Sequence, residues 1–511
     1  MLSLLALTLA AAVDAAPCEA LKAATLPHTT ITSVRLVPAG PFVAPAAQAG
    51  RGAGRGAAVP AAPAAPQGPI LPAHCRVAAV LTPSPDSHIE MEVWLPAENW
   101  NGKFQAVGNG GWAGVISYAA LASALQEGYA TASNDTGHKG GNALFAIDHP
   151  EKLTDFAYRA VHEMTVQSKA LIAQFYGRAP RFSYWNGCST GGRQGLMSAQ
   201  KYPADFDAIV AGAPANYQTH LHAWDLSVSV PVLKDPAGAV PPAKLEMVTA
   251  AVVAACDARD GVRDGLLNDP RACAFDIGTL QCKAGDAADC LTSAQVASMK
   301  RVYAPARTSA GAAVFPGKDP GSEAGWGGVL GGRQAPGVSM GSFQVAYNNP
   351  SWDPLTFDLD RDLALVDQKV GAPVNAVDPD LRAFKARGGK LLLYHGWNDT
   401  AISAGNSINY YQSVLAKSGA KMDGKQDDWI RLFMAPGMNH CGGGVGPSQA
   451  NWMGALERWR ESGTAPARIE AARVTGGRVD MTRPLCPYPQ VAVYSGVGST
   501  NDAGSFACKA P

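Results

Sequence analysis

The motif Gly187-Cys188-Ser189-Thr190-Gly191 has the pattern G-x-S-x-G and lies between two segments of different character. The preceding run RFSYWNG is short and apolar and predicts a β-strand, whereas the following GRQGLMSAQKYP predicts a helix. Glycines on both sides of the serine let the backbone take a strained turn without clashes of Cβ atoms. The helix that follows directs the positive end of its dipole at the turn. The motif therefore predicts a tight strand–turn–helix connection that presents Ser189 as a nucleophile.

The segments around this motif alternate between strand and helix patterns. Strands are predicted for HIEMEVWLP, KFQAVGNGG, GYATASND, FDAIVAGAP, GGKLLLYHGWND and WIRLFMAPGMNH. Residues 153–177 repeat apolar side chains at three- and four-residue steps, which predicts a long amphipathic helix that ends at Gly177. A further helix is predicted for SINYYQSVLAKSG. This alternation favours a parallel sheet in an α/β protein, and with the serine turn it predicts an α/β-hydrolase core.

The alternation stops after residue 213. Residues 214–385 are rich in Gly, Pro and Cys and show no sustained period, so we expect a large lid domain inserted between two strands of the core. The core then consists of residues 17–213 and 386–511. Within its first part, residues 39–70 are mostly Ala, Gly and Pro. They offer too little apolar surface to offset the cost of ordering them, which predicts a flexible insertion.

The triad partners of Ser189 follow from the order of residues in this fold. An α/β-hydrolase places its triad in the order Ser, Asp or Glu, His. The histidines after Ser189 are His220, His222, His395 and His440. His440 lies in a glycine-flanked loop after an apolar strand, and Asp399 comes directly after the strand KLLLYHG. Asp427 and Asp428 are the alternatives, in a charged stretch typical of an exposed loop. We expect Asp399 to hold the imidazole of His440 and to stabilise its cation.

The oxyanion hole of such a site needs two backbone N–H groups near the nucleophile. The N–H of Thr190, at the start of the helix, is the first candidate. The second lies in GNGGWAG, which follows the strand FQAV, and we expect it to be Gly110 or Gly111. The alternative is that these glycines form an ordinary turn.

The even number of cysteines, ten, favours disulfides. No pair has the C-x-x-C spacing of a zinc ribbon. Pairs close enough in sequence for local bridges are Cys256/Cys273 and Cys282/Cys290, and Cys486/Cys508 would fix the C-terminus. Spacing alone leaves the connectivity open.

One long-range bridge follows from the proposed triad. Ser189 and His440 must approach within hydrogen-bond reach, which also brings their chain neighbours Cys188 and Cys441 together. A disulfide Cys188–Cys441 would tie the nucleophile turn to the histidine loop and fix the geometry on which proton transfer depends.

The motifs GCSTGG, HGWND and NHC together resemble the tannase/feruloyl esterase family, which includes fungal tannases, feruloyl esterases and mono(2-hydroxyethyl) terephthalate hydrolase. The resemblance extends from Cys18 to the final YSGVGSTNDAGSFACKAP. The serine–cysteine and histidine–cysteine neighbours are specific to this family. It implies an α/β-hydrolase core with an inserted lid and a disulfide between the triad loops. It also implies the bridges Cys18–Cys75, Cys256–Cys273, Cys282–Cys290 and Cys486–Cys508.

The resemblance further implies a structural calcium ion (Ca²⁺) in the lid. The run CDARDGVRDGLLNDP offers the carboxylates of Asp257, Asp260 and Asp264, and the resemblance adds the backbone carbonyls of Val262 and Leu266. Carboxylates this close need a cation or solvent to relieve their repulsion, and hard oxygen ligands suit calcium. The alternative is a solvated acidic turn.

Two substrate contacts are suggested in the same way. His395 lies four residues before Asp399 and resembles a pocket histidine of the family, and Trp326 could stack on an aromatic ring from the lid. The alternative for both is a packing role.

The overall charge limits the classes of partner. Lys+Arg and Asp+Glu both number 42, so nothing favours nucleic acid or an anionic membrane. Residues 1–16 form an apolar run that ends in small residues, which predicts a signal peptide and a secreted or periplasmic protein.

We therefore expect a serine esterase for carboxylic esters of phenolic or aromatic acids, of the feruloyl or galloyl type. It would act on a small aromatic ester as a monomer or a homodimer. A terephthalate monoester hydrolase is the alternative within the same class. A catalytically silent surface-binding module is the alternative of another class.

Overall fold

The computed structural model describes residues 16–44, 68–419 and 428–510. Within these residues the centre of the fold is a nine-stranded sheet. In spatial order its strands are β1 (Thr29–Val37), β4 (His74–Leu81), β5 (Ile89–Pro96), β7 (Ala130–Asn134), β6 (Lys103–Val107), β8 (Phe182–Cys188), β9 (Ala208–Gly212), β12 (Lys390–Gly396) and β13 (Ile430–Ala435). The strands from β7 to β13 pair in parallel, and β5, β4 and β1 add an antiparallel edge.

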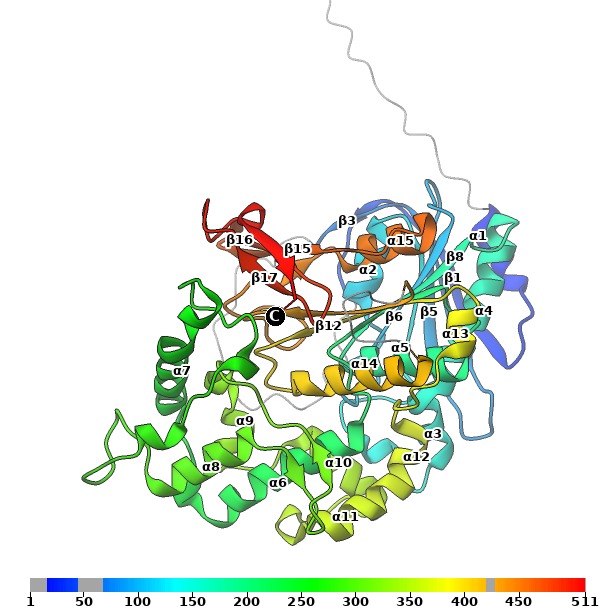
Figure 1. Cartoon of the computed structure of the whole chain (residues 1–511). Helices are drawn as coiled ribbons and strands as arrows, with labels where there is room; N and C mark the ends of the chain where they lie inside the picture. Colours follow the sequence, from blue (N-terminus) through cyan, green and yellow to red (C-terminus); the bar gives the residue numbers. More distant parts are fainter. Residues whose placement is uncertain (1–15, 45–67, 420–427, 511) are drawn as a thin grey trace, which may run out of the picture.

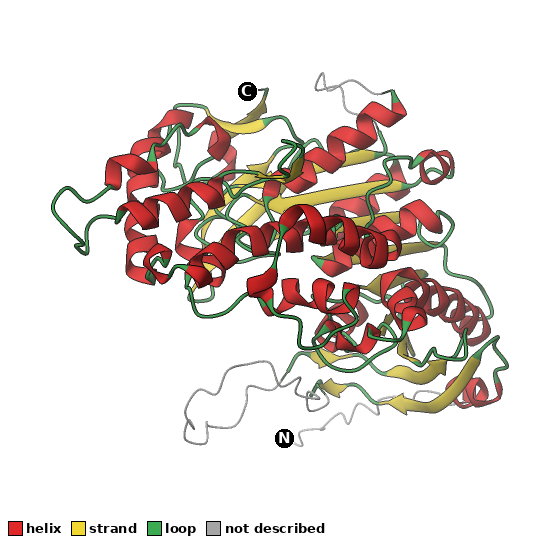
Figure 2. Ribbon diagram, turned by 90° about the horizontal axis from the view of Figure 1, so that it is seen from below, coloured by secondary structure: helices red, strands yellow, loops and turns green. Residues whose placement is uncertain are grey.

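Helices cover both faces of this sheet (Figures 1 and 2). One face packs against α4 (Ala160–Tyr176), α5 (Thr190–Lys201), α13 (Arg382–Ala386) and α14 (Ala404–Ser418), the other against α2 (Tyr118–Gln126) and α15 (Trp452–Ser462). Because side chains alternate along a strand, Leu391 and Leu393 of β12 face the first group while Leu392 and Tyr394 face the second. A parallel strand buried on both faces reads as a continuous apolar run, as β12 does. The predicted α/β-hydrolase core is the observed architecture.

The segment between β9 and β12 packs mostly into a second hydrophobic cluster, which it shares with Trp112 and with core residues between 143 and 157. Its helices are α6 (Gln218–Lys234), α7 (Pro242–Cys256), α8 (Ser293–Tyr303), α9 (Gly327–Leu330), α10 (Gly337–Ala346), α11 (Leu359–Val366) and α12 (Ala372–Val374). They lie below the sheet in Figure 1 and constitute the lid. α6 contacts α8, α9, α10 and α11, so it forms the centre of the lid.

The end of this segment differs from the expected boundary at residue 385. Ala376, Leu381 and Phe384 are buried in the cluster under the sheet and not in that of the lid. The apolar side chains after α12 thus return the chain to the core before β12 begins.

The described residues contain five disulfides, Cys18–Cys75, Cys188–Cys441, Cys256–Cys273, Cys282–Cys290 and Cys486–Cys508. The first joins α1 (Ala16–Ala20) to β4, and the third and fourth lie in the lid. The last joins β17 and β18, Val491–Tyr494 and Phe506–Lys509, to the end of β16 (Arg478–Leu485). β16 belongs to a small sheet with β14 (Gln449–Ala450) and β15 (Ile469–Thr475).

The ends of the Ala/Gly/Pro-rich segment are more ordered than expected. β2 (Gly40–Pro41) pairs with β3 (Ile70–Leu71), and the ring of Phe42 packs edge-on against Trp94. Leu71 and Phe42 belong to an apolar cluster with Trp94, which orders these two ends. Residues 45–67 of the predicted insertion, and residues 1–15 of the predicted signal peptide, lie outside the described residues. No described helix combines the length and apolar composition needed to cross a bilayer.

Candidate active site

Ser189 lies on a strained turn between β8 and α5. Its backbone has φ 63° and ψ −123°, a conformation that non-glycine residues rarely adopt. The turn is held by hydrogen bonds from the Ser189 N–H to Gly212 O at 2.9 Å and from the Ala215 N–H to Ser189 O at 3.1 Å. A Cβ on Gly187 would lie 2.5 Å from Gly191 O, so the close turn requires glycine there. The sequence motif is thus built as the tight turn that it predicts.

Asp399 and His440 are brought together from two neighbouring strands. Asp399 follows β12 and His440 follows β13, and His440 Nδ1 lies 2.7 Å from Asp399 Oδ2. The other carboxylate oxygen accepts hydrogen bonds from the N–H groups of Ala401 and Ile402, both at 2.8 Å. Asp399 is 2 % exposed. Of the two alternatives to Asp399, Asp428 is exposed, and Asp427 lies outside the described residues.

The environment of Asp399 keeps its carboxylate ionised. Burial alone would favour the neutral acid, but hydrogen bonds from His395 and His440 outweigh it and hold the pKa of Asp399 far below its ordinary value. The ionised carboxylate is therefore placed to stabilise a cation on His440.

His395 does not lie in the position expected of a substrate contact. It is fully buried, and its Nε2 lies 3.1 Å from Asp399 Oδ2 and 3.1 Å from Ile402 O. Its Nδ1 lies 2.7 Å from Ser407 Oγ on α14. The side chain is on the face of β12 that is turned to α14, so it contacts the acid of the candidate triad instead of a ligand.

The disulfide Cys188–Cys441 joins the residue before Ser189 to the residue after His440, across 253 positions of chain. Cys441 has φ 63°, in the left-handed region. Both loops that carry the candidate nucleophile and base are therefore bent sharply where this bridge connects them.

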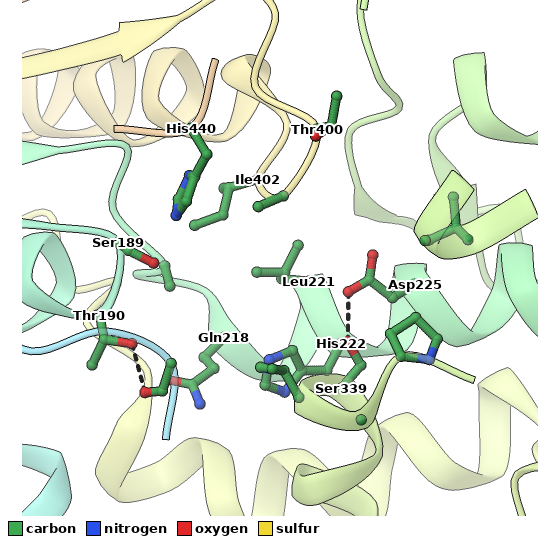
Figure 3. A pocket seen from close by; sticks show the side chains of 18 residues that line it. Ser189, Thr190, Gln218, Leu221, His222, Asp225, Ser339, Thr400, Ile402 and His440 are labelled. Carbon is green, nitrogen blue, oxygen red and sulfur yellow. Dashed lines mark hydrogen bonds between the residues drawn. The ribbon is translucent and has the colours of Figure 1, made fainter. Parts of the chain in front are cut away.

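A cavity of about 390 Å³ opens at these residues. Ser189 and His440 line it, and Figure 3 shows the imidazole of His440 pointing toward Ser189. Gly111 and Thr190 line the same end, and Thr190 Oγ1 donates a hydrogen bond to Gly111 O at 2.8 Å. Gly110 is not among the lining residues. Of the two glycines considered for the oxyanion hole, Gly111 is the one that lines the cavity with the candidate nucleophile.

The rest of the cavity wall comes largely from the lid. Apolar lining residues are Ala215, Leu221, Val329, Pro336, Val338 and Ile402, and polar ones are Gln218, His222, Asp225, Ser339 and Thr400. Trp326 is not among them, contrary to expectation. It is 1 % exposed, packs edge-on against Tyr303, and its indole N–H binds Ser322 Oγ at 3.0 Å. This large side chain is a core residue of the lid.

The acidic run in the lid, expected to hold calcium, forms a set of tight turns. Asp257 accepts hydrogen bonds from the N–H groups of Asp264 and Gly265, and Asp260 from those of Val262 and Asn268.

The carboxylates are only partly free for a cation. Asp264 Oδ2 lies 2.5 Å from Arg483 Nη2, so Asp264 already has a counter-charge. Burial, with the charges of Asp264 and Asp257, raises the pKa of Asp260 to about 6, which a bound cation would oppose. Across the described ranges, no three or more His, Cys, Asp or Glu side chains are gathered so as to hold a metal ion. Backbone oxygens, such as the carbonyls of Val262 and Leu266, would have to complete the coordination of calcium.

Residues 75–509 match the family model described as "Tannase and feruloyl esterase". The chain belongs to this family. It is thus a carboxylic ester hydrolase, and the predicted resemblance is confirmed.

Individual relatives agree with the family assignment of this esterase. An uncharacterized esterase from Xanthomonas campestris pv. campestris is 36% identical over 543 residues, covering 96% of this chain and 91% of its own. A probable feruloyl esterase B-2 from Aspergillus terreus is 36% identical over 456 residues, covering 85% and 86%.

Solved structures extend the likeness to the fold. Feruloyl esterase B from Aspergillus oryzae superposes with a TM-score of 0.89 at 32% identity, covering 97% of this chain and 99% of its own. A tannin acyl hydrolase from Aspergillus niger superposes with a TM-score of 0.77 at 22% identity, covering 98% and 95%, which bears on the fold alone.

Several residues of the esterase's cavity were not predicted from the sequence. Gln218, His222 and Asp225 lie on one side of α6, and Ser339 lies on α10. Burial lowers the pKa of His222 to about 3, so its imidazole is neutral. A buried helix that carries polar residues at positions i, i+4 and i+7 is the sequence signal that could have identified the three on α6.

Proposed function

We propose that this esterase hydrolyses esters of phenolic acids, of the feruloyl or galloyl type, through Ser189, His440 and Asp399 and an acyl-enzyme intermediate. The main support is the 2.7 Å contact of His440 Nδ1 with Asp399, in a cavity that His440 shares with Ser189. The names of the feruloyl esterase relatives support the choice of acyl group.

The geometry supports a separate role for each nitrogen of His440. Nδ1–H donates to Asp399, so Nε2 is the nitrogen that takes the proton of Ser189. Ser189 Oγ attacks the ester carbonyl carbon while its proton passes to Nε2. In this proposal the N–H groups of Thr190 and Gly111 stabilise the resulting oxyanion.

Collapse of this intermediate expels the alcohol, which takes the proton from Nε2. A water molecule then attacks the acyl-enzyme, loses a proton to the same nitrogen, and the released serine oxygen regains it. Asp399 stays ionised throughout and stabilises the imidazolium that forms in each half-reaction.

A fluorophosphonate probe tests the nucleophile directly. It should label the native enzyme and the control variant Ser462→Ala, which changes an exposed serine on α15, but not Ser189→Ala. Labelling that persists in Ser189→Ala would contradict the assignment.

A substrate panel tests the acyl group. Turnover of methyl ferulate or methyl gallate above that of mono(2-hydroxyethyl) terephthalate supports the proposal, whereas the reverse order favours the alternative hydrolase. A chain that is folded but is neither labelled nor active would favour the binding-module alternative.

We also propose that the protein is exported and that the lid binds calcium. The disulfides support export, because such bonds persist in oxidising compartments. N-terminal sequencing of the protein from the periplasm or medium should begin near residue 17. Light scattering distinguishes a monomer from a homodimer.

A further inference from the structure

Helix α6 forms one wall of the cavity, and its lining residues lie at increasing distances from the nucleophile. The Ala215 N–H binds Ser189 O just before this helix begins, so α6 starts beside the nucleophile. Gln218, His222 and Asp225 follow on one side of it and line the cavity. Seven positions of helix place Asp225 about 10 Å beyond Gln218. Figure 3 shows Asp225 across the cavity from Ser189.

The carboxylate of Asp225 presents an open acceptor to this far end. Its Oδ2 accepts a hydrogen bond from Ser339 Oγ at 2.5 Å, which fixes the orientation of the group. No described residue donates a hydrogen bond to Oδ1, and Figure 3 shows this oxygen turned away from Ser339. A carboxylate oxygen held in this way is matched by a ligand group that donates a hydrogen bond.

The charge around Asp225 favours its ionised form near neutral pH. Burial raises the pKa of Asp225 to about 6, and the charge of Lys318 and the bond from Ser339 limit the rise. Lys318 is buried over the ring of Trp224, 5.0 Å from its centroid, and does not line the cavity. A ligand therefore meets a negative group without meeting its counter-charge. This arrangement repels a second carboxylate.

Part of the cavity wall is apolar. Leu221, Val338, Pro336 and Ile402 line it, beside the polar side chains of Gln218 and the neutral His222. An aromatic ring suits such walls because its edges and faces need no hydrogen bonds, while a polar substituent at its far end needs a partner.

We infer that Asp225 binds a ring hydroxyl at the end of the acyl group remote from the ester, and so selects acyl groups that end in a phenol. The inference rests on the proposed function, which it narrows. An acyl group that ends in a methoxyl has no O–H to donate a hydrogen bond to Asp225. An acyl group that ends in a carboxylate is repelled by the negative charge of Asp225.

The test compares matched methyl esters on the native enzyme and on Asp225→Ala. The substrates are the 4-hydroxy, 4-methoxy, 4-carboxy and unsubstituted forms of methyl cinnamate and of methyl benzoate. In at least one series the native enzyme should show a kcat/KM about 10- to 100-fold higher for the 4-hydroxy ester than for the unsubstituted one, as expected for a charge-assisted hydrogen bond. In Asp225→Ala this ratio should fall to about 1.

Further variants keep the test decisive. Ser339→Ala and Asp225→Asn should each give ratios between those of the native enzyme and Asp225→Ala, and they serve in its place if that variant does not fold. Asp289→Ala removes an exposed carboxylate of the lid and should keep the native ratio.

The outcomes distinguish failure of the proposed function from failure of the role of Asp225. If the native enzyme hydrolyses none of these aromatic esters, the proposed function fails and this inference falls with it. If it hydrolyses them without preferring the hydroxyl, prefers the 4-carboxy ester, or keeps its preference when Asp225 is changed, only the role of Asp225 is overturned.

Discussion

Nε2 of His395 lies 3.1 Å from Oδ2 of Asp399, the same carboxylate oxygen that lies 2.7 Å from Nδ1 of His440. Ser407 in turn contacts Nδ1 of His395 at 2.7 Å. A chain of buried polar groups thus runs from α14 through His395 to the acid and on to the base of the candidate triad. Satisfied networks of this kind fix the orientation of their members.

We expect His395→Ala to lower kcat by about 10- to 100-fold with a smaller effect on KM, because the acid loses a positioning contact and not a substrate contact. Asp399→Asn should cost more, on the order of 10⁴-fold. Steady-state kinetics on variants shown to be folded by their melting curves give the comparison. The exposed His88→Ala is the control. A folded His395→Ala with native kcat, or with a raised KM alone, would contradict this role.

Removing the bridge beside the triad should affect catalysis as well as stability. A bridge that closes a loop of 253 positions stabilises the protein by about 5.5 kcal/mol in the chain-entropy model. Its ends also position Ser189 and His440, so Cys188→Ala with Cys441→Ala should cut kcat about 10- to 100-fold at temperatures where the protein stays folded.

The pair Cys486/Cys508 provides the matched comparison, since it lies at the C-terminal strands. Its removal should lower the melting temperature with little change in kcat. Mass spectrometry of a non-reduced digest checks that the peptides carrying Ser189 and His440 are linked. An active, folded Cys188/Cys441 variant would show that the bridge does not position the triad.

Calcium in the lid should appear as a contribution to stability. A chelator should lower the melting temperature by a few °C, because an ion bound only by the folded state stabilises it. Asp260→Ala should abolish this sensitivity, and Asp289→Ala should keep it. Elemental analysis that finds no calcium, together with an unchanged melting curve in chelator, would rule the site out.

Asp225 should also leave a signature in the pH dependence of stability. Its folded-state pKa, about 6, lies above that of an unfolded aspartate, about 3.9, so between these values the folded chain holds more protons. The free energy of unfolding contributed by this group therefore falls as pH rises from about 4 to 6 and is level above that.

Asp225→Asn should remove this fall, on the order of 2 kcal/mol between pH 4 and 7. Urea unfolding of both proteins at several pH values measures it. Two curves that stay parallel over this range would mean that Asp225 is not perturbed.

The sequence predicted the core and the three triad candidates because each of those residues directly follows an element with a clear pattern. His395 was misplaced for a physical reason. It alternates with Leu391 and Leu393 on one face of β12, and that face is covered by α14, a fact that depends on tertiary packing. The alternation of the strand would have indicated burial.

The lid was the least predictable part. α6 is buried on nearly all sides, so apolar residues are not confined to one face of it, and its 17 residues show no hydrophobic period of a helix in the sequence. The role of Asp225 depends on its neighbours Ser339 and Lys318, which come from distant segments. Trp326 was misassigned because a large aromatic side chain fits a core as well as a pocket.

The path of the chain into and out of the lid has a consequence for how such a pocket can change. The chain leaves the sheet at the carboxyl end of β9 and returns at the amino end of β12, its parallel neighbour. The whole lid is therefore one crossover connection, enlarged from a single helix into a domain. Two adjacent strands constrain only where such a connection starts and stops, not its length or content. Grafting the segment from one member of the family onto another should exchange the acyl-recognising wall as a cassette, while the sheet continues to present the same serine.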